Sequence, residues 1–153
     1  MSGIELILYE DRYAGDFKRL NLEWLEKYNL TEEYDLKVLD DPRGQVLDSG
    51  GVIYLAKAGD VIVGTLGLMK EHEGVYELVK MTVAEKWQGK GISKLLLDKC
   101  LDFARQQKFK MVTLYSNSQL QRAIKMYEKY GFRHVKLENS PLQTADVRME
   151  LIL

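Results

Sequence analysis

The sequence has few of the residues that build disulfides, metal sites or membrane spans. Its 153 residues include one cysteine, Cys100, and two histidines, His72 and His134. One cysteine excludes a disulfide within the chain, and a zinc site built from one cysteine and two histidines is unexpected, so we predict no metal. No apolar run reaches the roughly 18 residues that a membrane helix needs.

An excess of one charge is also lacking. The 22 Lys and Arg residues nearly balance the 23 Asp and Glu residues, which leaves a net charge of −1. This balance argues against a protein that binds DNA or RNA through an overall positive field. The N-terminal segment Met1–Glu5 has neither the basic region nor the apolar core of a secretion signal. We therefore expect a cytoplasmic protein with no nucleic-acid or membrane partner.

The residues that are present suit one globular domain. Hydrophobic residues make up 46% of the sequence and charged residues 29%. A domain has roughly 150 residues, and a chain of that length buries roughly 70% of the surface that its unfolded form exposes. We predict a single domain over residues 1–153.

Hydrophobic spacing and turn residues predict strands and helices in a mixed order. The predicted strands are Ile4–Leu8, Val52–Lys57, Val61–Leu68, Val75–Val83, Phe109–Tyr115, Arg133–Leu137 and Val147–Leu153. The predicted helices are Tyr13–Tyr28, a segment from an N-cap at Thr31 to Asp41, Ile92–Ala104, and a segment from a capping box at Ser118 and Gln121 to Gly131. Between them, Arg43–Gly51 is predicted to be a mobile loop. This order predicts a mixed α/β sheet with helices packed on it, and parallel pairing of the two strands that the Ile92 helix joins.

One loop has the chemistry of an anion site. The segment Gln88–Ser93, with the sequence QGKGIS, lies between a predicted strand and a predicted helix. The free N–H groups of a helix start attract anions, and glycines let a diphosphate approach the backbone. Lys86, Lys90 and Lys94 add positive charge nearby. A plain tight turn with solvated lysines would give the same local sequence.

Two motifs together resemble the signatures of the GNAT superfamily of N-acetyltransferases. The segment QGKGIS is similar to the motif Q/R-x-x-G-x-G/A, with Ser93 in the last position. The segment Ala123–Phe132, with the sequence AIKMYEKYGF, is similar to A-x-x-x-Y-x-x-x-G-F. The resemblance implies a GNAT-like fold, in which a central, mixed, mostly antiparallel sheet is flanked by about four helices. It also implies acetyl-CoA as cosubstrate.

The resemblance further implies which residues hold acetyl-CoA. The pyrophosphate would be held by Gln88, Gly89, Lys90, Gly91, Ile92 and Ser93, and the pantetheine arm by the backbone of Met81, Thr82 and Val83. Ala123 contributes from the second motif. Members commonly carry an asparagine where this chain has Leu120, and Asn117 is the candidate replacement.

Glu77 and Tyr127 are the candidate catalytic residues. Alternation along Val75–Val83 puts Glu77 on one face with Val79, Met81 and Val83, where desolvation would raise its pKa toward that of a useful general base. Acetyl transfer needs such a base, because a free amine is mostly protonated at neutral pH. GNAT members often place a catalytic glutamate at this strand position. A structural carboxylate at an exposed strand end remains the alternative.

Tyr127 lies on the inner face of its predicted helix, at the tyrosine of the second motif. The resemblance implies that its hydroxyl serves the departing thiolate of CoA as a general acid. An aromatic residue that only packs would have the same helical spacing. Cys100 lies on a buried helix stripe and is predicted to be a core residue rather than an acetyl carrier.

The leading interpretation is an N-acetyltransferase that moves an acetyl group directly from acetyl-CoA to a primary amine. The acceptor is an amine on a small molecule, a peptide or a protein, and a homodimer is left open. A non-catalytic acyl-CoA-binding sensor or interaction module on the same fold is the alternative. From position alone, Trp24, Tyr28 and Arg43–Gly51 are expected near the acceptor, whereas Asp146 is either a turn residue or a contact for a cationic substrate.

Overall fold

Residues 3–153 are described by a computed structural model, so Met1 and Ser2 of the N-terminal segment lie outside the described residues. One sheet has the strand order β1-β2-β3-β4-β5-β7-β6. Its strands are β1 (Ile4–Leu8), β2 (Val52–Ala58), β3 (Val61–His72), β4 (Val75–Val83), β5 (Met111–Ser116), β6 (Arg133–Val135) and β7 (Val147–Ile152). Among the strands of residues 3–153, only β4 and β5 pair in parallel, as predicted from the helix that joins them.

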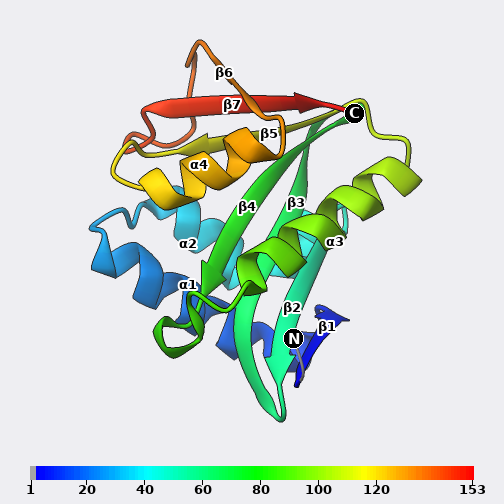
Figure 1. Cartoon of the computed structure of the whole chain (residues 1–153), viewed down its shortest axis with the longest axis vertical. Coiled ribbons are helices and arrows are strands. Elements are labelled where there is room, and N and C mark those ends of the chain that lie inside the picture. Colours follow the sequence, from blue (N-terminus) through cyan, green and yellow to red (C-terminus); the bar gives the residue numbers. More distant parts are fainter. Residues whose placement is uncertain (1–2) are drawn as a thin grey trace.

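Helices cover both faces of this sheet. They are α1 (Ala14–Lys27), α2 (Glu33–Asp40), α3 (Ile92–Gln106) and α4 (Gln121–Lys129), with short helical turns η1 (Asp11–Tyr13), η2 (Arg43–Leu47) and η3 (Glu85–Trp87). Apolar residues of α3 and α4 share one buried cluster with the sheet, and those of α1 and α2 share the other. In Figure 1, α3 crosses the near side of β2–β4, and α1 and α2 lie behind the sheet. The predicted mixed α/β fold with a mostly antiparallel sheet is confirmed.

Several predicted boundaries shift because distant side chains decide them. Helix α2 starts one residue later than predicted, since Glu32 rather than Thr31 is its N-cap and donates its N–H to Asp35 Oδ2 at 2.9 Å. The predicted capping box of α4 is wrong, because the hydroxyl of Ser118 donates instead to Asp146 Oδ2 at 2.7 Å. Asp146 lies directly before β7, and its carboxylate accepts from both the backbone N–H and the hydroxyl of Ser118.

The segment Arg43–Gly51 is not a loose loop. It forms the turn η2, Val46 is fully buried, and the carbonyl of Val46 accepts a hydrogen bond from Gly51 N at 3.0 Å. The strand bounds also differ: pairing of His72 with Val75 extends β3, whereas β6 ends at Val135 after three paired residues. Backbone pairing across the hairpin turn, rather than the spacing of apolar residues, thus sets the end of β3.

A β-bulge in β4 interrupts the predicted alternation. Thr65 pairs with Thr82 and Gly67 with Val79, so two residue steps on β3 oppose three on β4. Lys80 takes up the extra step with φ of +56°. Val79 lies in the cluster on the α1 side, whereas Val83 lies in the cluster on the α3 side. The prediction that Met81 and Val83 share a face with Glu77 is therefore wrong.

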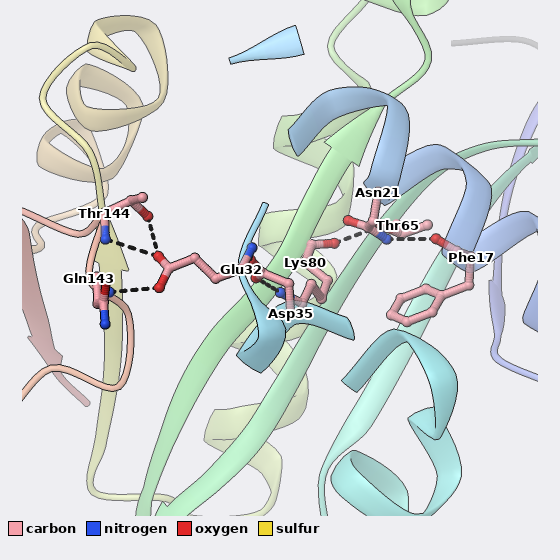
Figure 2. A network of polar contacts seen from close by, with 8 residues as sticks. All are labelled: Phe17, Asn21, Glu32, Asp35, Thr65, Lys80, Gln143 and Thr144. Atoms are coloured by element: carbon pink, nitrogen blue, oxygen red, sulfur yellow. Dashed lines mark hydrogen bonds and ion pairs between the residues drawn. The ribbon is translucent and has the colours of Figure 1, made fainter. Parts of the chain in front are cut away.

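Buried hydrogen bonds hold the bulge in place. The hydroxyl of Thr65 donates to the carbonyl of Lys80 at 2.6 Å. It accepts from Asn21 Nδ2 at 3.1 Å, and the same amide donates to the carbonyl of Phe17 at 2.8 Å (Figure 2). Helix α1 is thereby tied to the irregular part of β4.

Candidate active site

A cleft opens where β4 and β5 separate. The two strands pair only through Val75, Tyr76 and Glu77 of β4 and Met111, Val112 and Thr113 of β5. Beyond these residues, Leu78–Val83 has no β5 residue paired beside it, so this edge of β4 faces the cleft. The carbonyls of Lys80 and Val83 are already engaged by Thr65 and Gln88. Both strands contribute to the lining of the cavity that follows.

The inner cavity, of about 130 Å³, lies between this split and the helices α1 and α2. Its walls are mostly apolar and aromatic, and Glu77, Asp35 and Lys80 are the charged side chains among them. The remaining lining includes Leu25, Leu30, Tyr34, Val38, Tyr115, Asn117, Tyr127, Leu142 and Thr144.

Burial gives Glu77 an unusual proton affinity. The residue is only 6% exposed. Desolvation, reinforced by the nearby Glu71 carboxylate and opposed by Arg148 and Lys80, raises the pKa of Glu77 to about 7. Within residues 3–153 no salt bridge holds Glu77, whereas Glu71 pairs with Arg148 at 2.8 Å and Asp35 pairs with Lys80. Glu77 can therefore exchange a proton near neutral pH.

Tyr127 lines the same cavity from α4. Burial raises the pKa of its hydroxyl far above the ordinary value, so the side chain stays protonated at neutral pH. Its hydroxyl lies 3.8 Å from the sulfur of Met81 on the bulged part of β4. The phenol is thus a permanent hydrogen-bond donor beside this strand.

An outer groove runs from the bulge to the start of α3. It is lined by residues of β4, η3, the glycine loop and the first turns of α3 and α4. Gly89 and Gly91 have φ of +76° and +82°, which residues with a side chain rarely adopt. Gly91 is the N-cap of α3, and the N–H groups that follow it have no partner within the helix. This end of the groove can therefore hold an anion.

The inner cavity and the outer groove share four lining residues, namely Trp24, Met81, Leu120 and Ala123. A long ligand lying in the groove would thus reach the cavity beside Met81. Thr82, Val83, Gln88, Ile92 and Ser93 also line the groove.

Some predicted site residues lie elsewhere or are already engaged. Lys90 is exposed and does not line the groove, although Lys94 does. Asn117 lies in the inner cavity, where its Nδ2 donates to the carbonyl of Thr144 at 2.6 Å. Tyr28 lines the outer groove, whereas Arg43–Gly51 lines neither space. Cys100 is fully buried in the α3-side cluster, away from both.

The sequence patterns did not identify Asp35, Lys80, Glu32 or Thr144 as site residues. The first two line the cavity as an ion pair, and Glu32 accepts hydrogen bonds from the segment around Thr144. Charged residues in a short helix are normally solvent-facing, so only the unusual placement of Lys80 in an apolar strand was a local signal. No helix in residues 3–153 has the length and apolarity to cross a membrane. No cluster of metal-ligating side chains occurs in the same range.

Comparisons with known proteins agree with this geometry. The family model "Acetyltransferase (GNAT) family" matches residues 16–132. An uncharacterised N-acetyltransferase of Bacillus subtilis, YvbK, is 30% identical over 121 residues, which cover 77% of each chain. Human N-acetylaspartate synthetase is 33% identical over 87 residues, but these span only 29% of that protein and 56% of this chain.

Solved structures show the same fold. A GNAT acetyltransferase from Staphylococcus aureus superposes with a TM-score of 0.88 at 26% identity, covering 96% of this chain and 97% of the other. The PaiA N-acetyltransferase of Thermoplasma acidophilum, solved in complex with coenzyme A, has a TM-score of 0.76 at 18% identity and covers the full length of both chains. The chain belongs to the GNAT family of N-acetyltransferases and is an acyltransferase.

Proposed function

We propose that this protein, acting as one domain, transfers an acetyl group directly from acetyl-CoA to a primary amine. The observation that carries the proposal is the junction at Met81. There the groove that ends at the glycine loop meets a cavity that contains a buried phenol, Tyr127, and the carboxylate of Glu77, which no salt bridge holds within residues 3–153. Family membership supplies the general chemistry, which is acyl transfer from CoA to an amine.

In this proposal the outer groove holds acetyl-CoA. The pyrophosphate lies at the start of α3, against the glycine loop and the first N–H groups of the helix. The groove-lining segment Met81–Val83 lies beyond the pairing with β5, and its edge on that side faces the pantetheine arm and the thioester. Gln88 supports the loop, because its Nε2 donates to the carbonyl of Val83 at 3.1 Å.

The acceptor amine enters the inner cavity. Glu77 takes the proton that the amine loses, and the amine nitrogen attacks the thioester carbonyl carbon, so that a C–N bond forms. A backbone N–H of the unpaired part of β4 stabilises the resulting oxyanion. The C–S bond then breaks, and Tyr127 donates a hydrogen bond or proton to the departing thiolate. Exchange with solvent removes the proton from Glu77 and returns to Tyr127 any proton that it gave.

Thiol release with a panel of primary amines tests the proposal. Purified protein is incubated with acetyl-CoA and each amine, and reactions without an amine correct for hydrolysis. We expect amine-dependent thiol release and an equal amount of N-acetylated product by mass spectrometry. Stabilisation by acetyl-CoA without any amine-dependent release would contradict acetyl transfer.

A further inference from the structure

The outer wall of the inner cavity is a segment without regular secondary structure. This segment, residues 136–146, is called the strap below; it joins β6 to β7. Its residues Leu142, Thr144 and Ala145 line the cavity and are half-buried, whereas Gln143 between them is exposed. The strap therefore lies between the cavity and solvent.

Thr144 is held from both sides of the cleft. From the β5 side, Asn117 Nδ2 donates to its carbonyl at 2.6 Å. From α2, the Glu32 carboxylate accepts from Thr144 N at 2.9 Å, from Thr144 Oγ1 at 2.5 Å and from Gln143 N at 2.8 Å (Figure 2). One carboxylate thus closes the span between α2 and the strap with three hydrogen bonds.

Glu32 is itself fixed to β4, the strand that carries Glu77. Its backbone N–H donates to Asp35 Oδ2 at 2.9 Å, and Asp35 Oδ1 forms the ion pair with Lys80 at the bulge (Figure 2). The Asp35 and Lys80 side chains are only 4% and 9% exposed. Asp35 thus fixes the position of Glu32, and through it that of the strap, relative to β4, the strand that carries Glu77.

The charge on Glu32 persists at neutral pH. Burial alone would raise the pKa of Glu32, but the hydrogen bonds from Thr144 and Gln143 and the charge of Lys80 outweigh it and lower the pKa below its ordinary value. A carboxylate with a lowered pKa loses its charge only under acidic conditions. The three hydrogen bonds are thus charge-assisted throughout the neutral range.

The lining also limits the acceptor's chemistry. Lys80 is the one cation among the described residues that line the cavity, and Asp35 engages it. Arg148 acts on Glu77 from outside this lining; its Nη2 donates to both oxygens of Glu71 at 2.8 and 2.9 Å, while its buried Nη1 has no partner among the described residues. A carboxylate on the acceptor would find no free cation there, while apolar atoms would meet Leu25, Leu30 and Val38.

We infer that Glu32 determines acceptor specificity by holding the strap over the cavity, so that the acceptor is a compact apolar amine without a carboxylate. This inference rests on the proposed acetyl transfer. Peptides and protein termini would be poor acceptors, because the strap covers the solvent side of the cavity where their chain would extend.

The test compares three acceptors and two glutamate variants. Pentylamine is the compact apolar amine, and 5-aminopentanoate has the same length with a carboxylate. The peptide is trialanine amide, called trialanine from here on, which has no free carboxylate. Glu32→Ala removes all three hydrogen bonds, and Glu33→Ala is the matched control, since Glu33 is the exposed neighbour in the same helix turn. Glu32→Gln, which keeps one acceptor oxygen, is measured beside them in case the alanine variant does not fold.

We expect the parent protein to prefer pentylamine over both other acceptors in kcat/KM. In Glu32→Ala, the trialanine-to-pentylamine ratio of kcat/KM should rise about tenfold or more, as should amide hydrogen exchange at Gln143 and Thr144, because charge-assisted hydrogen bonds are lost. The acetyl-CoA Kd should stay within about twofold, and Glu33→Ala should behave as the parent does.

Unchanged exchange at Gln143 and Thr144, or an unchanged acceptor ratio in both Glu32 variants, would overturn the inference. Faster turnover of trialanine or 5-aminopentanoate than of pentylamine by the parent would also overturn it, while leaving the proposed acetyl transfer intact. Absence of thiol release with every amine would instead overturn the proposed function, and this inference with it.

Discussion

At the scale of single residues, Glu77 is held where its charge opposes folding. An ordinary glutamate has a pKa of 4.5, whereas burial in the cavity raises the pKa of Glu77 to about 7. The folded protein therefore binds this proton more tightly than the unfolded chain does, so the stabilisation present below pH 4.5 is lost as the pH rises toward 7. A reactive carboxylate thus reduces the free energy of unfolding at neutral and alkaline pH.

Replacement of the Glu77 carboxylate should show how much its ionisation lowers the free energy of unfolding. At pH 8, Glu77→Gln should raise the free energy of unfolding by about 3 kcal/mol, and the gain should disappear near pH 4. Urea unfolding at both pH values measures it. Glu73→Gln is the control, because the Glu73 side chain is 92% exposed and should change stability at neither pH. Equal stability of the parent and Glu77→Gln at pH 8 would mean that burial of the ionised Glu77 does not destabilise the folded protein.

The hydroxyl of Tyr127 should act on the leaving group rather than on the amine. Tyr127→Phe should lower kcat by about 10²-fold, without rescue at alkaline pH and with a smaller loss for a thioester whose thiol leaves more easily. Tyr130→Phe is the matched control, because the Tyr130 hydroxyl donates to Asp98 at 2.6 Å and lines neither the cavity nor the groove. A Tyr127→Phe defect that is independent of the thiol would argue against a role as acid.

At the scale of secondary-structure elements, the bulge of β4 depends on one buried hydroxyl. Thr65→Val removes the donor to Lys80 O and the acceptor for Asn21 Nδ2, and leaves both groups buried. We expect a loss of about 2 kcal/mol or more in the free energy of unfolding, together with lower kcat/KM, because the bulge carries Met81. Thr113→Val is the control at another fully buried threonine, whose hydroxyl makes only a long contact of 3.4 Å with Glu71. Equal losses in the two variants would show that the Thr65 hydrogen bonds do not hold the bulge.

The glycine loop offers a matched pair of substitutions. Gly91 and Gly59 both have positive φ, +82° and +59°, and a Cβ at either would meet open space. Each glutamate variant should therefore pay a similar conformational strain of about 1–2 kcal/mol. Only Gly91→Glu should weaken acetyl-CoA binding, by about 100-fold, because its carboxylate would repel the phosphates at the helix start. Calorimetric titration that finds the same Kd for both variants would remove the loop from the site.

Local sequence patterns predicted the elements better than their ends. The spacing of apolar residues located β1 and β4 at their observed bounds, and the order of elements predicted the parallel pair. The bulge at Lys80 was not predictable, because it depends on Asn21 and Thr65, which lie far away in the sequence. The predicted start of α4 was wrong for a similar reason, since the hydroxyl of Ser118 donates to Asp146, 28 positions away in the sequence.

At the scale of the whole molecule, the site is built from segments that meet only in the folded chain. Glu77 stands out in the sequence because it is a carboxylate in an apolar strand, and Tyr127 because it is the tyrosine of the second motif. The fold brings both to one cavity. The acceptor side is different: Glu32 and Thr144 are 112 positions apart, and neither has a distinctive neighbourhood. Motifs thus located residues that line the outer groove, whereas the contacts between α2 and the strap required the structure.

The central claim is that Glu77 acts as the base in amine acetylation, and one pH–rate comparison tests it most directly. Thiol release is measured from about pH 5.5 to 9.5 with one amine for the parent and Glu77→Gln, after each is shown to bind acetyl-CoA equally. We predict that kcat/KM of the parent rises through an apparent pKa near 7. In Glu77→Gln this limb should be absent, with a loss of about 10²-fold near pH 7 that shrinks at alkaline pH, where more of the amine is free. The same profile and rate for both proteins would contradict the account, because the proton would then leave the amine without Glu77.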